Sequence, residues 1–220
     1  MFNFPCIYSN YNPMMRSDRQ PNSFVRILNA SPASPGVDVY LNGNLVAQNI
    51  TYGHFTPYLK LASGDAHIRV YRSGNVTNPI LTKSTVLAQK GIYTLSIIGK
   101  FPNTDILPIN DVRIPPNPNF ANLRFIHLSP DTPAVDIVLP NNTMIHSNLT
   151  YKGVTDYTPL SPGRYTIDVK LSGSNNIILT VPNIYLNAMK NLSVYIVGLF
   201  SGSPGLEVLI PLDGSSYLGF

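Results

Sequence analysis

Hydrophobic residues recur along the chain in short alternating runs, and these runs predict β-strands. In residues 66–71, Ile68 and Val70 fall on one face and polar or aromatic side chains on the other. This two-residue period is typical of a half-buried strand. Turn-forming pairs such as Asn42-Gly43 separate the runs and favour tight hairpins. No stretch shows a convincing apolar period of 3.6 residues, so helix content is expected to be very small.

The predicted strands fall into two series of similar spacing. The first series is expected at residues 24–28, 37–41, 45–50, 55–61, 66–71, 80–87 and 92–99. The second is expected at residues 123–128, 135–139, 144–149, 154–160, 164–171, 177–181, 192–199 and 206–211. Short strands at this spacing predict antiparallel sandwiches. The predicted fold class is therefore all-β, with two tandem antiparallel immunoglobulin-like β-sandwich domains joined by a Pro-rich linker.

The two series also share their residues. V-R-I-L-N-A-S-P-A-S-P-G-V-D-V-Y-L at 25–41 corresponds to L-R-F-I-H-L-S-P-D-T-P-A-V-D-I-V-L at 123–139, at an offset of 98 that becomes 99 further on. A period near one hundred residues indicates a duplicated domain, because solenoid and propeller units are shorter. The shared motif comprises Arg26, Ser31, Pro32, Pro35 and Asp38 in the first repeat, and Arg124, Ser129, Pro130, Pro133 and Asp136 in the second.

The duplication sets the expected domain boundaries. Prolines at 115, 116 and 118 favour extended polyproline geometry, which predicts a stiff spacer between the repeats. The expected parts are an aromatic, Asn- and Pro-rich arm at 1–22, sandwiches at 23–112 and 123–213, a linker at 113–122, and a C-terminal tail at 214–220.

The repeated aspartates and tyrosines are expected to serve structure first. Strand alternation turns Asp38 away from its apolar neighbours, where it would accept amide hydrogens of the loop or pair with Arg26. Asp136 is expected to behave in the same way, with Arg124 as its possible partner. Binding of a ligand or a cation is the alternative role for the two aspartates. Four further repeated residues are expected to be core or inter-sheet rings with hydroxyls bonded near the rim. They are Tyr52, Tyr58, Tyr151 and Tyr157, and a glycan-stacking platform is the alternative for them.

No residue pattern indicates catalysis, and no catalytic or cofactor-binding residue is predicted. The chain has no G-x-S-x-G, no Gly-rich phosphate loop and no C-x-x-C. His127, Ser129 and Asp131 carry the letters of a triad, but residues this close in sequence rarely converge as a triad does. We therefore expect a protein that is not an enzyme. A hydrolase with a site between the domains, using His127 or His146, is the least favoured alternative.

A calcium site at Asp131 and Asp136 has weak support. Calcium takes six to eight oxygen ligands, usually with several carboxylates among them. The first repeat has Ala33 in place of Asp131, so the two repeats would not share such a site. No metal ligand is predicted.

Composition excludes other function classes. Charged residues make up only 12% of the chain, and the net charge of +4 comes from fifteen scattered basic residues against eleven acids. Without a basic stripe, nucleic acid is not an expected partner. A weakly basic surface suits anionic glycans or neighbouring protein subunits equally well. No stretch of eighteen apolar residues is present, so no membrane span is expected.

The N-terminal arm supports two interpretations. It is either a disordered leader or a segment that docks onto a neighbouring subunit by strand addition. Its single cysteine offers a link between two chains. The expected intersubunit contacts are Phe2, Phe4, Cys6, Tyr8 and Tyr11.

The repeated segments resemble a bacterial family, the domain-of-unknown-function 4397 family, whose members open with Arg-x-x-His-x-Ser-Pro-Asp-x-Pro-x-Val-Asp. The second repeat matches this pattern closely, whereas the first departs from it at Asn29 and Ala33. The resemblance covers residues 24–212. It implies tandem β-sandwiches and, in many relatives, an extracytoplasmic or cell-envelope setting, and it implies no activity.

We therefore expect a non-enzymatic structural or interaction protein, a self-assembling component of a bacterial surface, spore coat or fibre. Its expected partners are copies of itself, other surface proteins or glycans, and no cofactor is expected. A carbohydrate- or adhesion-type binding module using exposed tyrosines is the alternative. The N-terminus lacks the positive and apolar regions of a signal peptide. Synthesis in the cytoplasm is expected, with a spore or cell surface as the destination considered.

Overall fold

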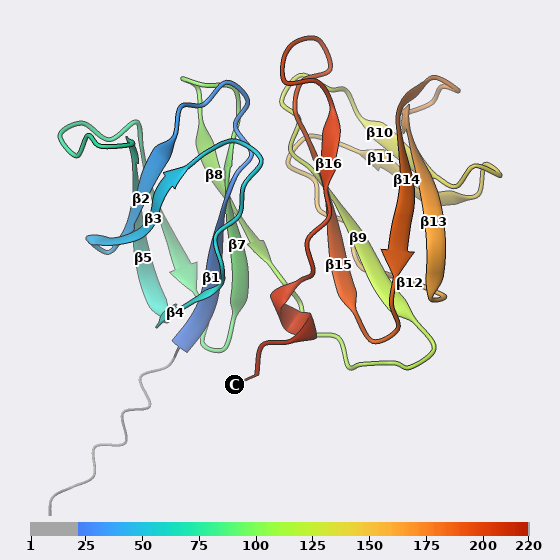
Figure 1. Ribbon diagram of the computed structural model, residues 1–220, viewed down its shortest axis with the longest axis horizontal. Helices are drawn as coiled ribbons and strands as arrows, with labels where there is room; N and C mark the ends of the chain where they lie inside the picture. Colours follow the sequence, from blue (N-terminus) through green and yellow to red (C-terminus); the bar gives the residue numbers. More distant parts are fainter. Residues whose placement is uncertain (1–21, 220) are drawn as a thin grey trace, which may run out of the picture.

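The computed structural model describes residues 22–219, which form sixteen strands and one short 3-10 helix (Figure 1). The first half contains β1 (Asn22–Asn29), β2 (Val37–Leu41), β3 (Asn44–Ile50), β4 (Leu59–Ala62), β5 (Gly64–Arg72), β6 (Leu81–Leu87), β7 (Ile92–Ile98) and β8 (Asp105–Asn110). The second contains β9 (Ala121–His127), β10 (Val135–Val138), β11 (Met144–Leu149), β12 (Thr158–Leu160), β13 (Gly163–Leu171), β14 (Ile177–Leu186), β15 (Asn191–Val197), β16 (Glu207–Leu209) and the helix η1 (Gly214–Ser216). The predicted contact residues Phe2, Phe4, Cys6, Tyr8 and Tyr11 lie outside the described residues.

Each half is a sandwich of two four-stranded sheets. In the first half the strand orders are β4-β1-β7-β8 and β3-β2-β5-β6, and in the second they are β12-β9-β15-β16 and β11-β10-β13-β14. The all-β prediction of two tandem sandwiches is confirmed. One pairing in each half, β1 with β7 and β9 with β15, is parallel, whereas the other pairings within the sheets are antiparallel.

The four sheets lie in one row, with the sheets of β1 and β9 facing each other across the middle (Figure 1). One apolar core fills each sandwich. A third core lies between the two inner sheets and joins the halves; its buried members are Leu28, Ala30, Ile98, Ile109, Ile126, Leu128, Tyr195 and Val197. The halves therefore share a hydrophobic layer in addition to their own cores.

This layering explains two kinds of strand in the sequence. In β5 the side chains alternate, with Ala66, Ile68 and Val70 buried and the residues between them largely exposed. In β9 every residue is buried, because one face lies on the sandwich core and the other on the layer between the halves. Strands covered on both faces give continuous apolar runs rather than alternation.

The structure differs from the sequence prediction at a few elements. Strand β8 was not predicted, since Pro108 interrupts its apolar run; the proline is accommodated because β8 is an edge strand. The strand expected at 55–61 begins only at Leu59, because Pro57 lacks the amide hydrogen that a continued ladder needs. Strand β14 extends five residues beyond its predicted end to Leu186. Residues 111–120, which include the prolines expected to form a spacer, carry no strand, and the sheets on either side pack directly together.

Candidate functional site

A cluster of buried polar side chains crosses the boundary between the halves, beside the apolar layer. We call it the interdomain clasp. Its members are Arg26, Tyr58, Thr94 and Asp111 from the first half, and Arg124, Tyr157, Ser193, Tyr195 and Asp213 from the second.

In the first half, Arg26 extends from β1 to the far side of the boundary. Its Nη2 lies 3.3 Å from Oδ1 of Asp213, and its Nη1 donates to the carbonyl of Leu212 at 3.1 Å. Within its own half, its Nε donates to Thr94 at 2.8 Å, and its guanidinium lies 4.7 Å from the ring centre of Tyr58. Its side chain is only 4% exposed, so it connects the halves from a buried position.

The second half repeats this arrangement, with its arginine reaching into the first half. Arg124 on β9 places its Nη2 2.5 Å from Oδ1 of Asp111, and its Nη1 donates to the carbonyl of Asn110 at 2.7 Å. Its Nε donates to Ser193 at 2.7 Å, and its guanidinium lies 4.7 Å from the ring centre of Tyr157. Each arginine thus bonds the carboxylate of the opposite half, as in an isologous dimer interface.

The two stacked tyrosines hold the carboxylates in place. The Tyr58 hydroxyl donates to Oδ2 of Asp111, and the Tyr157 hydroxyl donates to Oδ2 of Asp213 at 2.6 Å. Burial, followed by the neighbouring carboxylate, raises the pKa of both tyrosines far above the ordinary value. Both phenols therefore remain protonated donors at neutral pH.

Two arginines and two aspartates balance the formal charge of the clasp. Burial acts to lower the pKa of Arg26, but Tyr195, Tyr58 and the two carboxylates raise it above its ordinary value. Burial, together with repulsion from Asp111, raises the pKa of Asp213 to about 6. Buried charges of this kind are stable only when paired and hydrogen-bonded.

The C-terminal segment closes over the clasp from the second half to the first. The amide of Gly214 donates to the Tyr58 hydroxyl at 3.2 Å, and the ring of Tyr217 meets that of Tyr58 edge-on at 6.2 Å. A Cβ on Gly214 would lie 2.7 Å from Ile92. The segment expected as a tail is therefore part of the boundary.

The motif aspartates hold loops rather than arginines. Asp38 accepts hydrogen bonds from the amides of Asn49 at 2.7 Å and Gly74 at 3.0 Å. Asp136 accepts them from the amides of Asn148 at 2.8 Å and Gly173 at 3.2 Å. For Asp38, burial opposes this effect, but the amide bonds hold the carboxyl pKa below its usual range. For Asp136, the amide of Asn148 is the leading cause of the lowered pKa. Bonding to backbone amides agrees with the prediction, but the amides belong to β3, β11 and the turns after β5 and β13 rather than to the loop before each aspartate. The alternative of a pair with Arg26 or Arg124 is not found, because these arginines bond Asp213 and Asp111.

The family-like residues of the second repeat do not form a triad. Within the described residues, no hydrogen bond joins His127 to Ser129 or Asp131. Ser129 lies 2.6 Å from the Thr132 hydroxyl, and Asp131 accepts the amide of Phe200 at 2.8 Å. These side chains hold the β9–β10 loop and the β15–β16 loop against each other.

The remaining motif residues lie in the two loops that connect β1 to β2 and β9 to β10. Ser31 and Pro32 are buried, Pro35 and Pro130 are half-buried, and Pro133 is exposed. Prolines at these positions restrict the crossover between the two sheets of each sandwich.

No metal-binding arrangement is found in residues 22–219. No group of three or more His, Cys, Asp or Glu side chains is placed to hold an ion there. Asp131 and Asp136, considered for calcium, accept the amides of different loops. Within the same residues, no helix is long and apolar enough to span a membrane.

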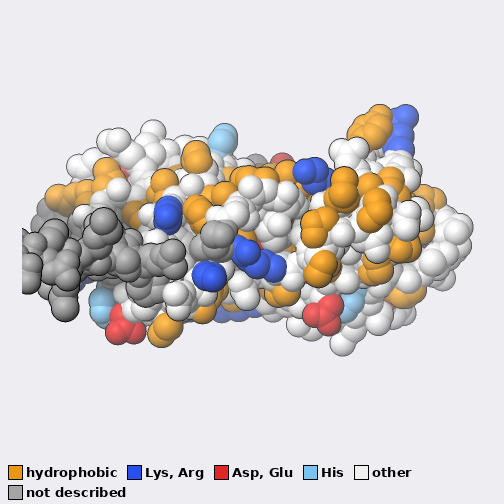
Figure 2. All heavy atoms as spheres, turned by 90° about the horizontal axis from the view of Figure 1, so that it is seen from below, with side chains coloured by type: hydrophobic (Ala, Val, Ile, Leu, Met, Phe, Trp, Pro, Cys, Tyr) orange, Lys and Arg blue, Asp and Glu red, His pale blue; other side chains and the backbone are white. Residues whose placement is uncertain are grey.

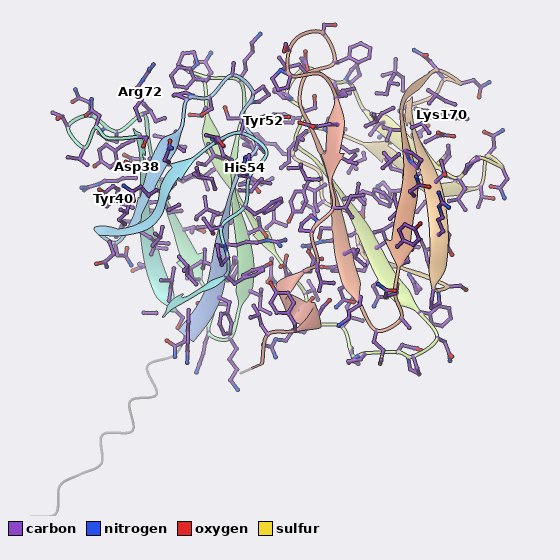
Figure 3. All side chains as sticks on the ribbon, viewed as in Figure 1. Asp38, Tyr40, Tyr52, His54, Arg72 and Lys170 are labelled. Carbon is purple, nitrogen blue, oxygen red and sulfur yellow. The ribbon has the colours of Figure 1, made fainter. Side chains whose placement is uncertain are left out.

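The repeated tyrosines are half-buried at the boundary between the halves. Tyr58 and Tyr157 are fixed in the clasp, so the alternative of an exposed glycan platform was wrong for these two. Tyr52 and Tyr151 pack on the apolar layer between the inner sheets, and Tyr52 lies between the halves in Figure 3. Their positions agree with the prediction of inter-sheet rings.

Sequence reasoning missed the two carboxylates of the clasp. The arginines and tyrosines repeat at offsets of 98 and 99, but Asp111 and Asp213 are 102 positions apart. The extra residues lie in the β15–β16 loop, where 198–206 replace the shorter 99–104 of the first half. Allowing for a gap there would have aligned the two aspartates.

A family model described as "Domain of unknown function (DUF4397)" matches residues 23–138 and 133–215. No curated protein matches the sequence. Among solved structures, the Bacillus anthracis TIE protein is similar at 12% identity and a TM-score of 0.26, over 80% of this chain and 34% of that chain. The chain thus spans about a third of that protein's length. A family CBM26 module from Eubacterium rectale Amy13K, solved with maltoheptaose, is similar at 12% identity and a TM-score of 0.29, over 88% of this chain and 99% of that chain.

Proposed function

The chain belongs to the DUF4397 family, and from this premise and the interdomain clasp we propose that it is a non-enzymatic structural protein. Its role would be that of a rigid two-domain building block in a self-assembling bacterial surface, spore coat or fibre. The observation that supports this proposal is the reciprocal bonding of Arg26 to Asp213 and of Arg124 to Asp111.

A clasp of this kind makes two domains behave as one body. The buried ion pairs and the apolar layer between the inner sheets resist rotation of one sandwich against the other. The two outer sheets therefore keep a fixed relation at opposite ends of the molecule (Figure 1). Their outermost strands, β3 and β6 at one end and β11 and β14 at the other, have an unpaired edge within the described residues. Open edges permit strand addition between subunits.

The sparsely charged surface is consistent with this role. On the face in Figure 2, basic side chains lie at separate places among polar and hydrophobic ones, and acidic side chains are few. Because only 12% of the residues are charged, contact between copies would bury few charges.

The mass of the protein in solution tests self-assembly. Full-length protein is compared with a form lacking residues 1–21 and with Cys6→Ser, by size-exclusion chromatography with light scattering under oxidising and reducing conditions. We expect concentration-dependent oligomers of the full-length chain that are weaker without the arm; Cys6→Ser should remove only the oxidised species. A monomer in every form at high concentration would contradict the proposal.

The proposed destination is a spore or cell surface. Immunogold labelling of intact cells and spores tests it. Label on the outer layers is expected, and label confined to the cytoplasm would contradict a surface role.

A further inference from the structure

An open pocket of about 630 Å³ lies at the boundary between the halves, away from the clasp, and we call it the seam pocket. The first half contributes the β7–β8 loop, and the second half contributes Pro130 and the β11–β12 turn. Its lining residues are Gly99, Lys100, Phe101, Asn103, Thr104, Asp105, Pro130, Tyr151 and Lys152. Its volume is within the range of small-molecule sites in proteins.

Cations outnumber carboxylates in this pocket. Asp105 is its one acidic lining residue, and its oxygens lie 3.2 Å from Nζ of Lys152 and 2.7 Å from Nζ of Lys83. Lys100 is exposed at the rim and adds a further positive charge. The excess of positive charge favours an anionic ligand.

Two aromatic rings, one from each half, line the pocket, and Nζ of Lys152 lies 5.6 Å from the ring centre of Tyr151. Phe101 and Tyr151 are both half-buried lining residues, so each keeps a fixed position with part of its ring accessible. The guanidinium of Arg72, labelled at the upper edge of the first half in Figure 3, lies 4.9 Å from the ring centre of Phe101. Burial and the nearby Asp105 raise the pKa of Tyr151, so its hydroxyl stays neutral.

The matched seam, formed by the corresponding residues with the two halves exchanged, lacks the two lysines. Lys100 corresponds to Leu199, and Lys152 corresponds to Gly53. The acidic position is kept: Asp105 pairs with Ile98 on β7, and Glu207 pairs with the corresponding Val197 on β15. The two basic residues are therefore not required by the shared framework.

The loops of the two seams also differ. Residues 198–206 form a longer loop than the matched 99–104, and Asp131 holds it through the amides of Phe200 and Ser201. On that side the hydroxyl of Tyr52 is buried. Only one of the two duplicated seams thus combines a short loop with two lysines.

We propose that the seam pocket binds a carboxylate-bearing sugar unit of an acidic polysaccharide. The carboxylate would be held by Lys100 and Lys152, and the apolar face of the sugar ring would lie against Phe101 or Tyr151. Sugar hydroxyls would donate to Asp105, the acceptor that remains at the pocket wall. An acidic peptide would meet the lysines equally well, but its acidic side chains carry no ring whose apolar face could lie against Phe101 or Tyr151. The site does not depend on self-assembly.

Titration of the full-length chain with trigalacturonate at low salt tests the site. Calorimetry measures the affinity, and NMR chemical shifts report which pocket residues are affected. Maltotriose serves as the neutral probe and a hexaglutamate peptide as the acidic one. We expect trigalacturonate alone to bind, with shifts at Lys100 and Tyr151 and an affinity that falls as salt rises. Lys100→Ala and Lys152→Ala should each weaken binding about tenfold, which corresponds to the loss of one charge-assisted bond.

Lys60→Ala is the matched control, because Lys60 is an exposed lysine on β4 outside the lining of the pocket. It removes the same charge and should leave the affinity within about twofold. Absence of trigalacturonate binding at millimolar concentration would overturn the proposal. Binding of maltotriose or hexaglutamate with the same affinity as trigalacturonate would also overturn it. The same holds if Lys60→Ala loses as much affinity as the two pocket variants. Light scattering on the same samples reports self-assembly separately, so each proposal can fail without the other.

Discussion

The guanidinium groups of Arg26 and Arg124 are almost completely buried at the boundary between the halves. Each has bonds on all three of its nitrogens, to a hydroxyl, a carbonyl and a carboxylate. An arginine suits this position because its planar fork remains charged and offers several donors in fixed directions. At the scale of single residues, the clasp is therefore a fully hydrogen-bonded ionic network, which is the arrangement in which buried charge is tolerated.

Replacing Arg26 by alanine should strongly destabilise the protein. The change leaves Asp213 buried with one guanidinium fewer and removes one of the two donors to the Thr94 hydroxyl, the other being Tyr195. Loss of one partner from a buried ion pair costs about 3–5 kcal/mol. Urea denaturation measures the free energy of unfolding. The control is Arg164→Ala, an exposed arginine bonded to Asn183, which should cost about 1 kcal/mol or less. Equal losses in the two variants would contradict a special role for the clasp.

Asp213 should make stability depend on pH in an unusual direction. Its pKa of about 6 in the folded protein exceeds the ordinary 3.8, so the folded state binds its proton first as pH falls. The stabilising contribution is fully present below about pH 4 and is lost as pH rises through 6. The difference in free energy of unfolding between the wild type and Asp213→Asn isolates this contribution, and it should shrink as pH rises through that window. A carboxyl carbon of Asp213 that titrates below pH 4 by NMR would contradict it.

At the scale of elements, a bulge and an aspartate recur together in each sandwich. The pairing of β2 with β3 and of β10 with β11 shifts register beside Asp38 and Asp136. Asn49 and Asn148 adopt left-handed φ values of 47° and 55° there, and their amides donate to the two aspartates. A bulge bends its strand and leaves an amide without a ladder partner, so a carboxylate beside it satisfies that amide.

Replacing Asp136 by alanine should therefore loosen the edge of the second sandwich. The amides of Asn148 and Gly173 would lose their acceptor, and so would the Ser172 hydroxyl. A loss of about 2–3 kcal/mol in the free energy of unfolding is expected from removing bonds to a charged group. The control Asp156→Ala changes an exposed aspartate and should have little effect. Amide exchange provides the local measurement: faster exchange at Asn148 is expected, and unchanged protection there would contradict the account.

Prediction from sequence worked best where local chemistry decides the structure. The alternation in β5 and the Asn42-Gly43 turn placed their strands correctly, because period and turn type depend on neighbouring residues. Strand β8 was missed because its edge position, not its own sequence, allows Pro108. Asp111 was not singled out, since its role depends on an arginine in the other half. Contacts between distant segments are the part that one sequence cannot supply.

At the scale of the whole molecule, the duplicated sandwiches form one stack of four sheets with a shared boundary. Apolar packing, the two reciprocal ion pairs and the C-terminal segment all cross that boundary. The same boundary also contains the seam pocket, whose two lysines have no counterpart in the matched positions of the other repeat. The boundary therefore both fixes the shape proposed for a building block and offers the place where a ligand would be bound.

Differential scanning calorimetry tests most directly whether the two halves form one cooperative unit. We expect a single transition for the wild type, with a calorimetric enthalpy equal to the van't Hoff enthalpy. The Arg26→Ala, Arg124→Ala double variant should lower the transition temperature and separate the unfolding of the two sandwiches. Two independent transitions in the wild type, unchanged in the double variant, would contradict the claim that the clasp joins the halves into one body.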